Sequence, residues 1–332
     1  MAVTIKDVAR AAGVSPATVC RALSNPDLVR AETGARVRRA AAELGYSPNR
    51  AARGLITGRT GNLGLIVPDL ANPFFPGVVK GIQARAREAD YAVFLADTDE
   101  DPAAEVQLVR TLAKQVDGIV LCSPRMGERE LRDVAAQSPL VMLNRRIGRI
   151  PSVTFANGDG MRQAVTHLTA LGHRRIAYVA GPRASWSNRE RIRGLRAVGA
   201  AAGVELIEIG PVQPQFDGGV AAADPVLAAG VTAVIAYNDL IALGLLSRFT
   251  ARGIAVPAEI SVLGFDDIPM AGMVHPSLTT VGLPMESCGR AGVDLLIGLL
   301  HDPARHATAR RELATQLMVR ASTGPRLRKG SP

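Results

Sequence analysis

The chain has 332 residues, of which 47% are hydrophobic, and a formal net charge of +9. This length and apolar content can supply the hydrophobic cores of two or three domains, which excludes an intrinsically disordered protein. No run approaches the ~18 apolar residues of a membrane span, and the N-terminal segment lacks the apolar stretch of a signal peptide, so a cytoplasmic protein without membrane contact is predicted. Cys20, Cys122 and Cys288 lack the spacing of a zinc site or disulfide framework, so no metal and no cofactor is expected.

The first predicted element is a pair of short helices within residues 4–23. Apolar residues follow helical spacing over residues 5–12, Gly13 interrupts the pattern, and the spacing resumes after Pro16. Ser15 suits the N-cap and Pro16 the first position of the second helix. Two helices joined by a glycine-containing turn are typical of a helix-turn-helix that reads the DNA major groove. The alternative is a helical hairpin of an ordinary core, which can carry the same spacing.

The charge distribution favours the DNA-binding interpretation. Residues 1–60 contain ten Lys and Arg against four Asp and Glu, which places +6 of the +9 in this segment. Such clustering favours a polyanionic partner, although a solvated basic face is the alternative. A third helix is predicted to end at Gly45. Residues 47–62, rich in Arg and Gly, are predicted to form a linker with a short helix near residues 49–56.

From Leu63 onward, nearly continuous apolar strands alternate with amphipathic helices. This alternation predicts parallel sheets covered on both faces, and the number of strands favours two α/β subdomains. The predicted strands are residues 63–68, 91–96, 117–122, 139–143, 153–155, 175–180, 204–209, 232–237 and 261–265. The predicted helices lie near residues 76–89, 102–114, 128–137, 158–171, 187–202, 238–252 and 286–300.

Motifs typical of enzymes are absent from the sequence. It contains no GxGxxG, P-loop, HExxH or GxSxG pattern, and its five histidines are scattered. The acidic run at residues 97–101 resembles the start of a helix, with Asp101 as N-cap before Pro102, more than a metal site. The chain is therefore predicted not to be an enzyme and to have no catalytic residue.

Several separated motifs together resemble the LacI/GalR family of bacterial transcription regulators. In chain order they are TIKDVARAAGVSPATVCRAL, LGYSPNRAARGL, GLIVPDLANPFF, DGIVL, LGHRRIAYVAG, YNDLIALG, ISVLGFDDIPMA and PSLTTV. The resemblance implies an α-helical helix-turn-helix headpiece at residues 1–48, a hinge helix and linker at 49–60, and an effector-binding and dimerisation core at 61–332. That core would be α/β, with two parallel-sheet subdomains of periplasmic-binding-protein type. The resemblance further implies a homodimer that binds a pseudo-palindromic operator in double-stranded DNA.

The same resemblance implies which residues contact DNA. Arg21 can bond guanine bidentately, whereas Pro16 and Ala17 offer only apolar contact. Leu55 would wedge into the minor groove at the operator centre, or alternatively pack against its dimer mate. About eight residues cannot sustain a helix alone, so we expect the hinge to fold only on the operator. The implied DNA-binding residues are Thr4, Ser15, Pro16, Ala17, Thr18, Arg21, Asn49, Arg50 and Leu55.

The resemblance also implies an effector pocket between the subdomains, at the carboxyl ends of strands. Arg191 and Asp266 are its strongest candidates, because charges near a cleft are hard to explain as packing. Asp, Asn and Arg side chains can bond several hydroxyls while an aromatic ring stacks on a sugar or base, which suits a carbohydrate or nucleoside. The implied residues are Asn72, Phe74, Phe75, Arg145, Trp186, Arg191, Asn238 and Asp266.

The sequence therefore predicts a DNA-binding transcriptional repressor whose operator affinity is controlled by a small-molecule effector. One alternative is a regulator of the same fold that responds to a protein partner, as in catabolite control. Another is a solute-binding or enzymatic α/β protein with an incidental helical hairpin. The missing signal peptide and catalytic motifs argue against that last alternative.

Overall fold

Three helices form the N-terminal part of the chain. The structure, a computed structural model, describes residues 3–24, 28–46 and 59–326. The helices are α1 (Ile5–Ala11), α2 (Pro16–Ser24) and α3 (Ala31–Glu43). Residues 1–61 form one unit and residues 62–332 another. The predicted helix pair and the third helix are thus all present, whereas the predicted hinge helix near residues 49–56 lies outside the described residues.

Gly13 and Ser15 separate α1 from α2 and begin α2, as the sequence predicts. Gly13, between α1 and α2, has φ of +60°, a left-handed conformation that favours glycine. The Ser15 hydroxyl accepts a hydrogen bond from the Thr18 N–H at 3.2 Å and so caps α2. The core between the three helices consists of small apolar side chains, namely Val8, Ala9, Ala12, Val19, Ala22, Val37, Ala40 and Ala41.

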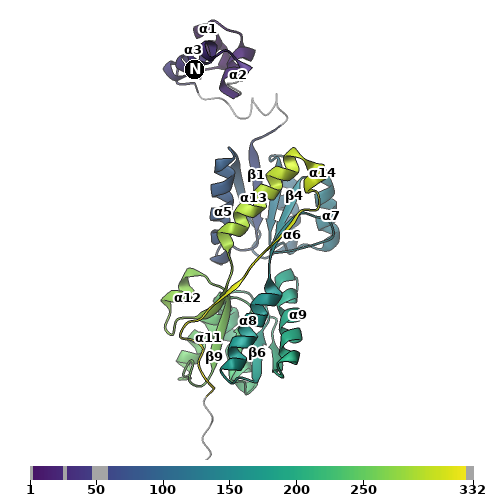
Figure 1. Ribbon diagram of the computed structural model, residues 1–332, viewed down its shortest axis with the longest axis vertical. Coiled ribbons are helices and arrows are strands. Elements are labelled where there is room, and N and C mark those ends of the chain that lie inside the picture. Colours follow the sequence, from purple (N-terminus) through teal and green to yellow (C-terminus); the bar gives the residue numbers. More distant parts are fainter. Residues whose placement is uncertain (1–2, 25–27, 47–58, 327–332) are drawn as a thin grey trace, which may run out of the picture. The chain divides into compact units, whose positions relative to one another are not determined.

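Two six-stranded sheets form the second unit (Figure 1). The first, ordered β11-β5-β4-β3-β1-β2, contains β1 (Asn62–Val67), β2 (Ala92–Asp97), β3 (Gly118–Cys122), β4 (Leu140–Leu143), β5 (Ser152–Phe155) and β11 (Arg310–Leu313). The second, ordered β12-β10-β9-β8-β6-β7, contains β6 (Arg175–Val179), β7 (Glu205–Ile209), β8 (Ala233–Ala236), β9 (Ser261–Asp266), β10 (Thr279–Gly282) and β12 (Gln316–Met318). Neighbouring strands are parallel except for β10 and β12.

Helices accompany each sheet and define two subdomains. The first subdomain has α5 (Phe74–Glu88), α6 (Pro102–Leu112), α7 (Glu128–Gln137), α13 (Met285–His301) and α14 (Pro303–His306). The second has α8 (Asn157–Ala170), α9 (Trp186–Ala201), α10 (Phe216–Ala228), α11 (Asp239–Ala251) and α12 (Pro269–Met273). Leu65 and Ile66, adjacent in β1, belong to different buried clusters, so the first sheet is covered on both faces as predicted.

The chain passes between the two sheets three times. Only Ala156 separates β5 from α8, residues 283–284 join β10 to α13, and residues 314–315 join β11 to β12. Helix α13 therefore packs on β3, β4 and β5 although it follows a strand of the second sheet. As a result, each sheet is completed by a strand from near the end of the chain.

The nine predicted strands are all present, with bounds that differ by at most one residue. Three strands, β10, β11 and β12, were not predicted, because segments of three or four residues carry too little periodicity to stand out. Helix α10 was also missed, since Gly218, Gly219 and Pro225 are poor helix formers. In the structure, a Cβ at Gly219 would lie 2.1 Å from the Ile241 carbonyl oxygen, so glycine permits α10 to approach α11 closely.

Glycines also bring α5 and α13 together. A Cβ added at Gly81 would lie 2.1 Å from the carbonyl oxygen of Glu286, and one at Gly289 would lie 2.3 Å from the carbonyl oxygen of Val78. Both obstacles are backbone atoms, which no rotamer change can move. The two helices can keep this separation only while both positions lack a side chain.

The substitution Gly81→Ala is expected to destabilise the first subdomain by about 1–3 kcal/mol, because the added methyl group forces α5 and α13 apart. The midpoint of urea unfolding should fall accordingly. Gly272→Ala is a matched control, because a Cβ at Gly272 in α12 would meet no atom within 4 Å. Equal midpoints for the two variants would contradict the close-packing argument.

Within the described ranges, no helix is both long and apolar enough to cross a membrane. The same residues contain no group of three or more His, Cys, Asp or Glu side chains that could hold a metal ion. Cys20, Cys122 and Cys288 are free thiols. Burial raises the pKa of Cys122 to about 12, which makes its thiol unreactive near neutral pH.

Candidate functional site

One face of α2 carries the residues implied in base recognition. Pro16, Ala17 and Arg21 are exposed, as is Ser15 at the start of the helix. The hydroxyls of Ser15 and Thr18 lie 2.9 Å apart and hydrogen-bond to each other. An exposed guanidinium on this face can reach a base edge, while the paired hydroxyls fix the first turn of the helix.

Thr4 precedes α1 and bonds to the carboxylate of Asp7. Its hydroxyl donates to Asp7 Oδ2 at 2.7 Å, and its N–H donates to the same oxygen at 3.0 Å. These hydrogen bonds hold the pKa of Asp7 below its usual value. The Thr4 side chain therefore secures the start of α1. Asn49, Arg50 and Leu55, the other residues implied in DNA binding, lie outside the described residues.

Side chains from both subdomains line a small cavity where the strands end. Its volume is about 20 Å³, enough for about one water molecule, whereas sites for small ligands measure several hundred Å³. A ligand of that size does not fit in this cavity at the present separation of the subdomains. The lining residues are Asn72, Phe74, Phe75, Glu100, Ser123, Arg125, Asn144, Arg191, Pro214, Tyr237, Asn238 and Asp266.

The backbone next to this cavity adopts an uncommon conformation. Seven described non-glycine residues have φ between +48° and +124°. One of them, Asp90, follows α5. The other six come at or just after the carboxyl ends of β2, β3, β4 and β9, and are Asp99, Glu100, Ser123, Asn144, Asp266 and Asp267. Sparsely populated conformations cluster at ligand sites, because the surrounding structure must hold side chains in defined directions.

A buried ion pair forms the wall of the second subdomain. Arg191 Nη2 lies 3.5 Å from Asp266 Oδ1, and the two side chains are 2% and 7% exposed. Arg191 Nε donates to Asn157 Oδ1 at 3.0 Å, Nη1 donates to the Tyr237 carbonyl, and the guanidinium lies 3.6 Å from the ring centroid of Phe265. Burial raises the pKa of Asp266 well above its usual value, while the charge of Arg191 opposes this shift.

A second buried ion pair forms the wall of the first subdomain. Arg125 Nε and Nη2 donate to the two carboxylate oxygens of Glu100 at 2.5 and 2.8 Å, and Nη1 donates to the Ser123 carbonyl at 2.7 Å. Sequence reasoning missed both residues. Glu100 belongs to the acidic run whose Asp101 caps α6, as predicted, by accepting from the Ala103 N–H at 2.8 Å.

The cavity lining includes six of the eight implied effector residues. Arg145 is absent from the lining, and its guanidinium donates to the carbonyls of Pro124 and Met126 at 2.8 and 2.7 Å. It therefore positions the loop that carries Arg125. Trp186 is also absent from the lining and is half-buried at the first residue of α9.

Asn238 lines the cavity, yet its amide also stabilises the surrounding structure. Its Oδ1 accepts from the Ile241 N–H at 2.9 Å and so caps α11, while Nδ2 donates to the Pro214 carbonyl at 2.7 Å. Gln215, which follows Pro214 of the lining, donates from Nε2 to Asp69 Oδ2 at 3.1 Å. This hydrogen bond links the loop after β7 to the loop after β1, and thus the two subdomains.

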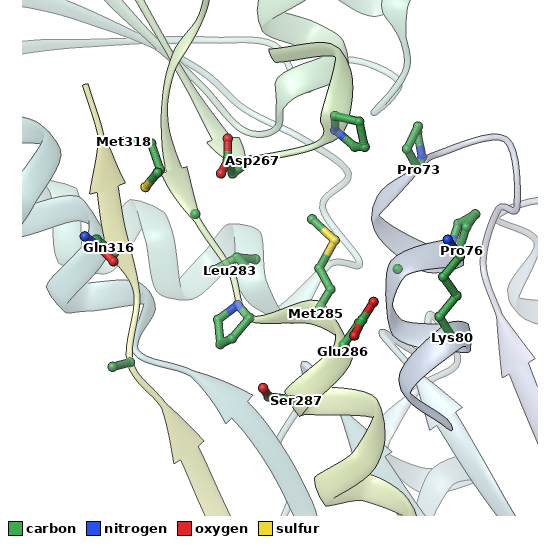
Figure 2. A pocket seen from close by; sticks show the side chains of 15 residues that line it. Pro73, Pro76, Lys80, Asp267, Leu283, Met285, Glu286, Ser287, Gln316 and Met318 are labelled. Carbon is green, nitrogen blue, oxygen red and sulfur yellow. The ribbon is translucent and has the colours of Figure 1, made fainter. Parts of the chain in front are cut away.

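A larger cavity of about 670 Å³ lies at the segments that connect the subdomains (Figure 2). Leu283 and Ala314, from two of these connections, line it together with Lys80 of α5. Figure 2 shows Met285 and Glu286, at the start of α13, beside Pro76 of α5. The segments that connect the subdomains therefore form part of the wall of this cavity.

Asp239, buried behind Asp266, gives the core a defined pH dependence. Its carboxylate accepts from Thr280 Oγ1 at 2.5 Å and from the Ile268 N–H at 2.9 Å, and burial raises its pKa to about 6. The folded state therefore holds this proton more tightly than the unfolded state. The contribution of Asp239 to the free energy of unfolding should fall by about 2 kcal/mol as the pH rises from 4 to 6.

Asp239→Asn should remove this fall, and urea unfolding of both proteins between pH 4 and pH 7 measures it. Asp266 shifts stability in the same direction in both proteins, so the difference between the two curves reports Asp239 together with its interaction with Asp266. If the free energy of unfolding depended on pH in the same way in both proteins, Asp239 would not have the raised pKa assigned to it.

Comparison with known proteins identifies two regions of similarity. Residues 4–49 match the bacterial regulatory proteins of the lacI family, and residues 165–323 match a periplasmic binding protein-like domain. The chain is 33% identical to the HTH-type transcriptional regulator DegA of Bacillus subtilis, over 98% of this chain and 99% of that protein.

Two solved structures are similar over almost the whole chain. The lac repressor dimer bound to operator and an anti-inducer has 31% identity and a TM-score of 0.87, covering 98% of this chain and 100% of that one. The complex of the transcriptional regulator CelR with cellobiose has 33% identity and a TM-score of 0.72, covering 96% of this chain and 99% of that one.

Proposed function

The chain belongs to the lacI family of bacterial regulatory proteins, and on this basis we propose that it is a transcriptional repressor whose affinity for a DNA operator is controlled by a small-molecule effector. The observation that carries the proposal is the combination of two sites in one chain. The headpiece exposes a recognition helix with Arg21 at its surface, and the core encloses a polar cavity between two parallel-sheet subdomains. We place this repressor in the cytoplasm, where its DNA target lies.

Each part of the chain has a role in this proposal. Residues 1–48 read the operator, residues 49–60 form the hinge, and residues 61–332 bind effector and a second copy of the chain. Arg21 contacts a base edge, while Thr4, Ser15 and Thr18 position the helix on phosphates. Asn49, Arg50 and Leu55 contact DNA from the hinge. A homodimer presents two recognition helices, so the operator is pseudo-palindromic.

The effector acts through separation and closure of the two subdomains. It enters between Arg191 and Asp266 on one wall and Asn72 with the adjacent Phe74 on the other, and changes the fraction of the protein that can hold the operator. A coupling free energy of about 1–3 kcal/mol between the two sites changes operator affinity by roughly 5- to 150-fold. The hydroxyl-bonding groups of the cavity suit a carbohydrate or nucleoside. The solved relative CelR binds cellobiose, a carbohydrate.

In vitro selection of DNA from a random pool, using the full-length protein, tests the DNA-binding half of the proposal. We expect enrichment of one pseudo-palindromic sequence, whose affinity falls steeply as salt is raised because phosphate contacts release counterions. Failure to enrich any sequence would refute a sequence-specific repressor. Calorimetry of the same protein with sugars and nucleosides tests the effector half. Binding of none, together with intact operator binding, would favour control by a protein partner.

A further inference from the structure

The two walls of the effector cavity contain equal numbers of positive and negative charges. We infer that the Glu100–Arg125 ion pair makes this cavity selective for uncharged, hydroxyl-rich ligands and excludes their phosphorylated forms. This inference rests on the proposed function, because it concerns the ligand of the same cavity. It narrows the effector class to free sugars and nucleosides, and excludes sugar phosphates and nucleotides.

The geometry of the pair leaves Arg125 little capacity for an incoming anion. Both carboxylate oxygens of Glu100 accept from its guanidinium, and a third N–H is taken by the Ser123 carbonyl. The side chains of Arg125 and Glu100 are only 4% and 16% exposed. A phosphate that bonded the remaining N–H groups of Arg125 would lie beside the buried carboxylate of Glu100, and the repulsion between the two anions would oppose its binding.

The charges around the cavity also disfavour the binding of a phosphate group. Its described lining contains two cations, Arg125 and Arg191, and two carboxylates, Glu100 and Asp266. Each cation already faces a carboxyl group, and with both carboxyl groups ionised the net charge of the lining is zero. Two further buried carboxylates lie near the lining, since Asp239 follows Asn238 and Asp69 shares a loop with Asn72. The buried cation Arg145 interacts with Arg125, but the buried carboxyl group of Glu105 offsets its charge. A phosphate group brings a charge of about −1.5 to −2, and no cation in the lining is available to balance it.

Asn144 offers a hydrogen-bond acceptor to a ligand hydroxyl. Its Nδ2 donates to Ser123 Oγ at 2.9 Å, whereas its buried Oδ1 accepts no hydrogen bond from the described part of the protein. A buried acceptor without a donor costs free energy, and a ligand hydroxyl can satisfy it. A deprotonated phosphate oxygen cannot, because it has no proton to donate. The site therefore favours the binding of hydroxyl groups and disfavours the binding of phosphate groups.

Calorimetry of the full-length dimer with matched ligand pairs tests this inference. The pairs are ribose and ribose 5-phosphate, glucose and glucose 6-phosphate, and cytidine and cytidine 5′-monophosphate. We expect the uncharged member of the binding pair to bind at least about tenfold more tightly. Tighter binding of a phosphorylated member would overturn the inference while leaving the proposed function intact. Absence of binding for every pair at millimolar concentration would overturn the inference together with the sugar or nucleoside effector.

Glu100→Gln tests the role of the ion pair directly. The substitution keeps the shape of the side chain but leaves the charge of Arg125 unbalanced, so the preference for the uncharged ligand should fall by about tenfold or more. The double variant Glu100→Gln, Arg125→Gln restores a neutral wall and should recover the preference. Glu128→Gln is a control, since Glu128 forms an exposed pair with Arg132. An unchanged preference in folded Glu100→Gln would show that the ion pair does not select ligands. If that variant does not fold, calorimetry of the unmodified protein with the matched ligand pairs still tests the inference.

Discussion

Replacing Arg191 with alanine is expected to abolish effector binding and to lower the free energy of unfolding of the core by about 3–5 kcal/mol. The Arg191 side chain is 2% exposed and supplies the cation opposite Asp266. Without it, a buried carboxylate has no counter-charge, and the Asn157 side chain and the Tyr237 carbonyl lose a donor. Effector affinity should drop by about 100-fold or more, because a charged hydrogen-bond donor disappears from the site.

A second substitution separates the loss of stability from the loss of binding. Adding Asp266→Asn to Arg191→Ala removes the uncompensated charge, so urea unfolding should recover part of the stability while calorimetry still detects no effector. Arg193→Ala is the matched control on the same helix, since Arg193 is 73% exposed and pairs with Glu190 at the surface. Operator affinity of the folded variants should stay near that of the unmodified protein. Normal effector binding by Arg191→Ala would refute the assignment of the cavity.

Replacing Arg21 with alanine is expected to weaken operator binding by roughly 30-fold to 10⁴-fold. A bidentate bond between Arg and guanine contributes about 1–3 kcal/mol, and a homodimer loses two of them. The loss should be large here because Pro16 and Ala17, the other residues that the resemblance implies in base recognition, offer only apolar contacts. Electrophoretic mobility shifts with the selected operator and with a version altered at the contacted guanine measure both affinity and discrimination.

Arg21→Lys distinguishes base reading from phosphate contact. Lysine keeps the positive charge but lacks the planar fork of donors that matches guanine, so we expect discrimination between the two operators to fall while binding to nonspecific DNA is retained. If Arg21→Lys and Arg21→Ala both kept full discrimination, Arg21 would be a phosphate contact, and base reading would have to come from elsewhere.

The fold could be predicted from the sequence wherever periodicity was long enough. Strands such as β3 and β4 are continuous apolar runs, and the headpiece is marked by Gly13, Ser15 and Pro16, whose conformational preferences are local. The pairing of β10 and β12 is not local. It depends on a chain that returns from the first sheet to the second, and a segment of three residues in β12 carries no pattern that reveals this.

The cavity could be predicted only in part, for a related reason. Family resemblance pointed to Arg191 and Asp266, which the structure brings together across 75 residues of chain. It did not point to Glu100 or Arg125, because an acidic run before a helix has a sufficient local explanation in the cap formed by Asp101. The order of the strands in the sheet is the signal that could have indicated these two residues. Both residues follow strands that flank β1, so their loops meet at one edge of the sheet.

The three passages of the chain between the sheets also constrain how the protein can be synthesised. The first subdomain requires α13 and β11, and the second requires β12, so neither is complete until the ribosome has translated residue 301 and then residues 310–318. Until then, β5 and β10 are unprotected sheet edges on a growing chain, and such edges promote aggregation. Folding of the core is therefore expected to be mainly post-translational, with both subdomains completed almost together. The headpiece, whose three helices share a buried core of their own, can fold as soon as it leaves the ribosome.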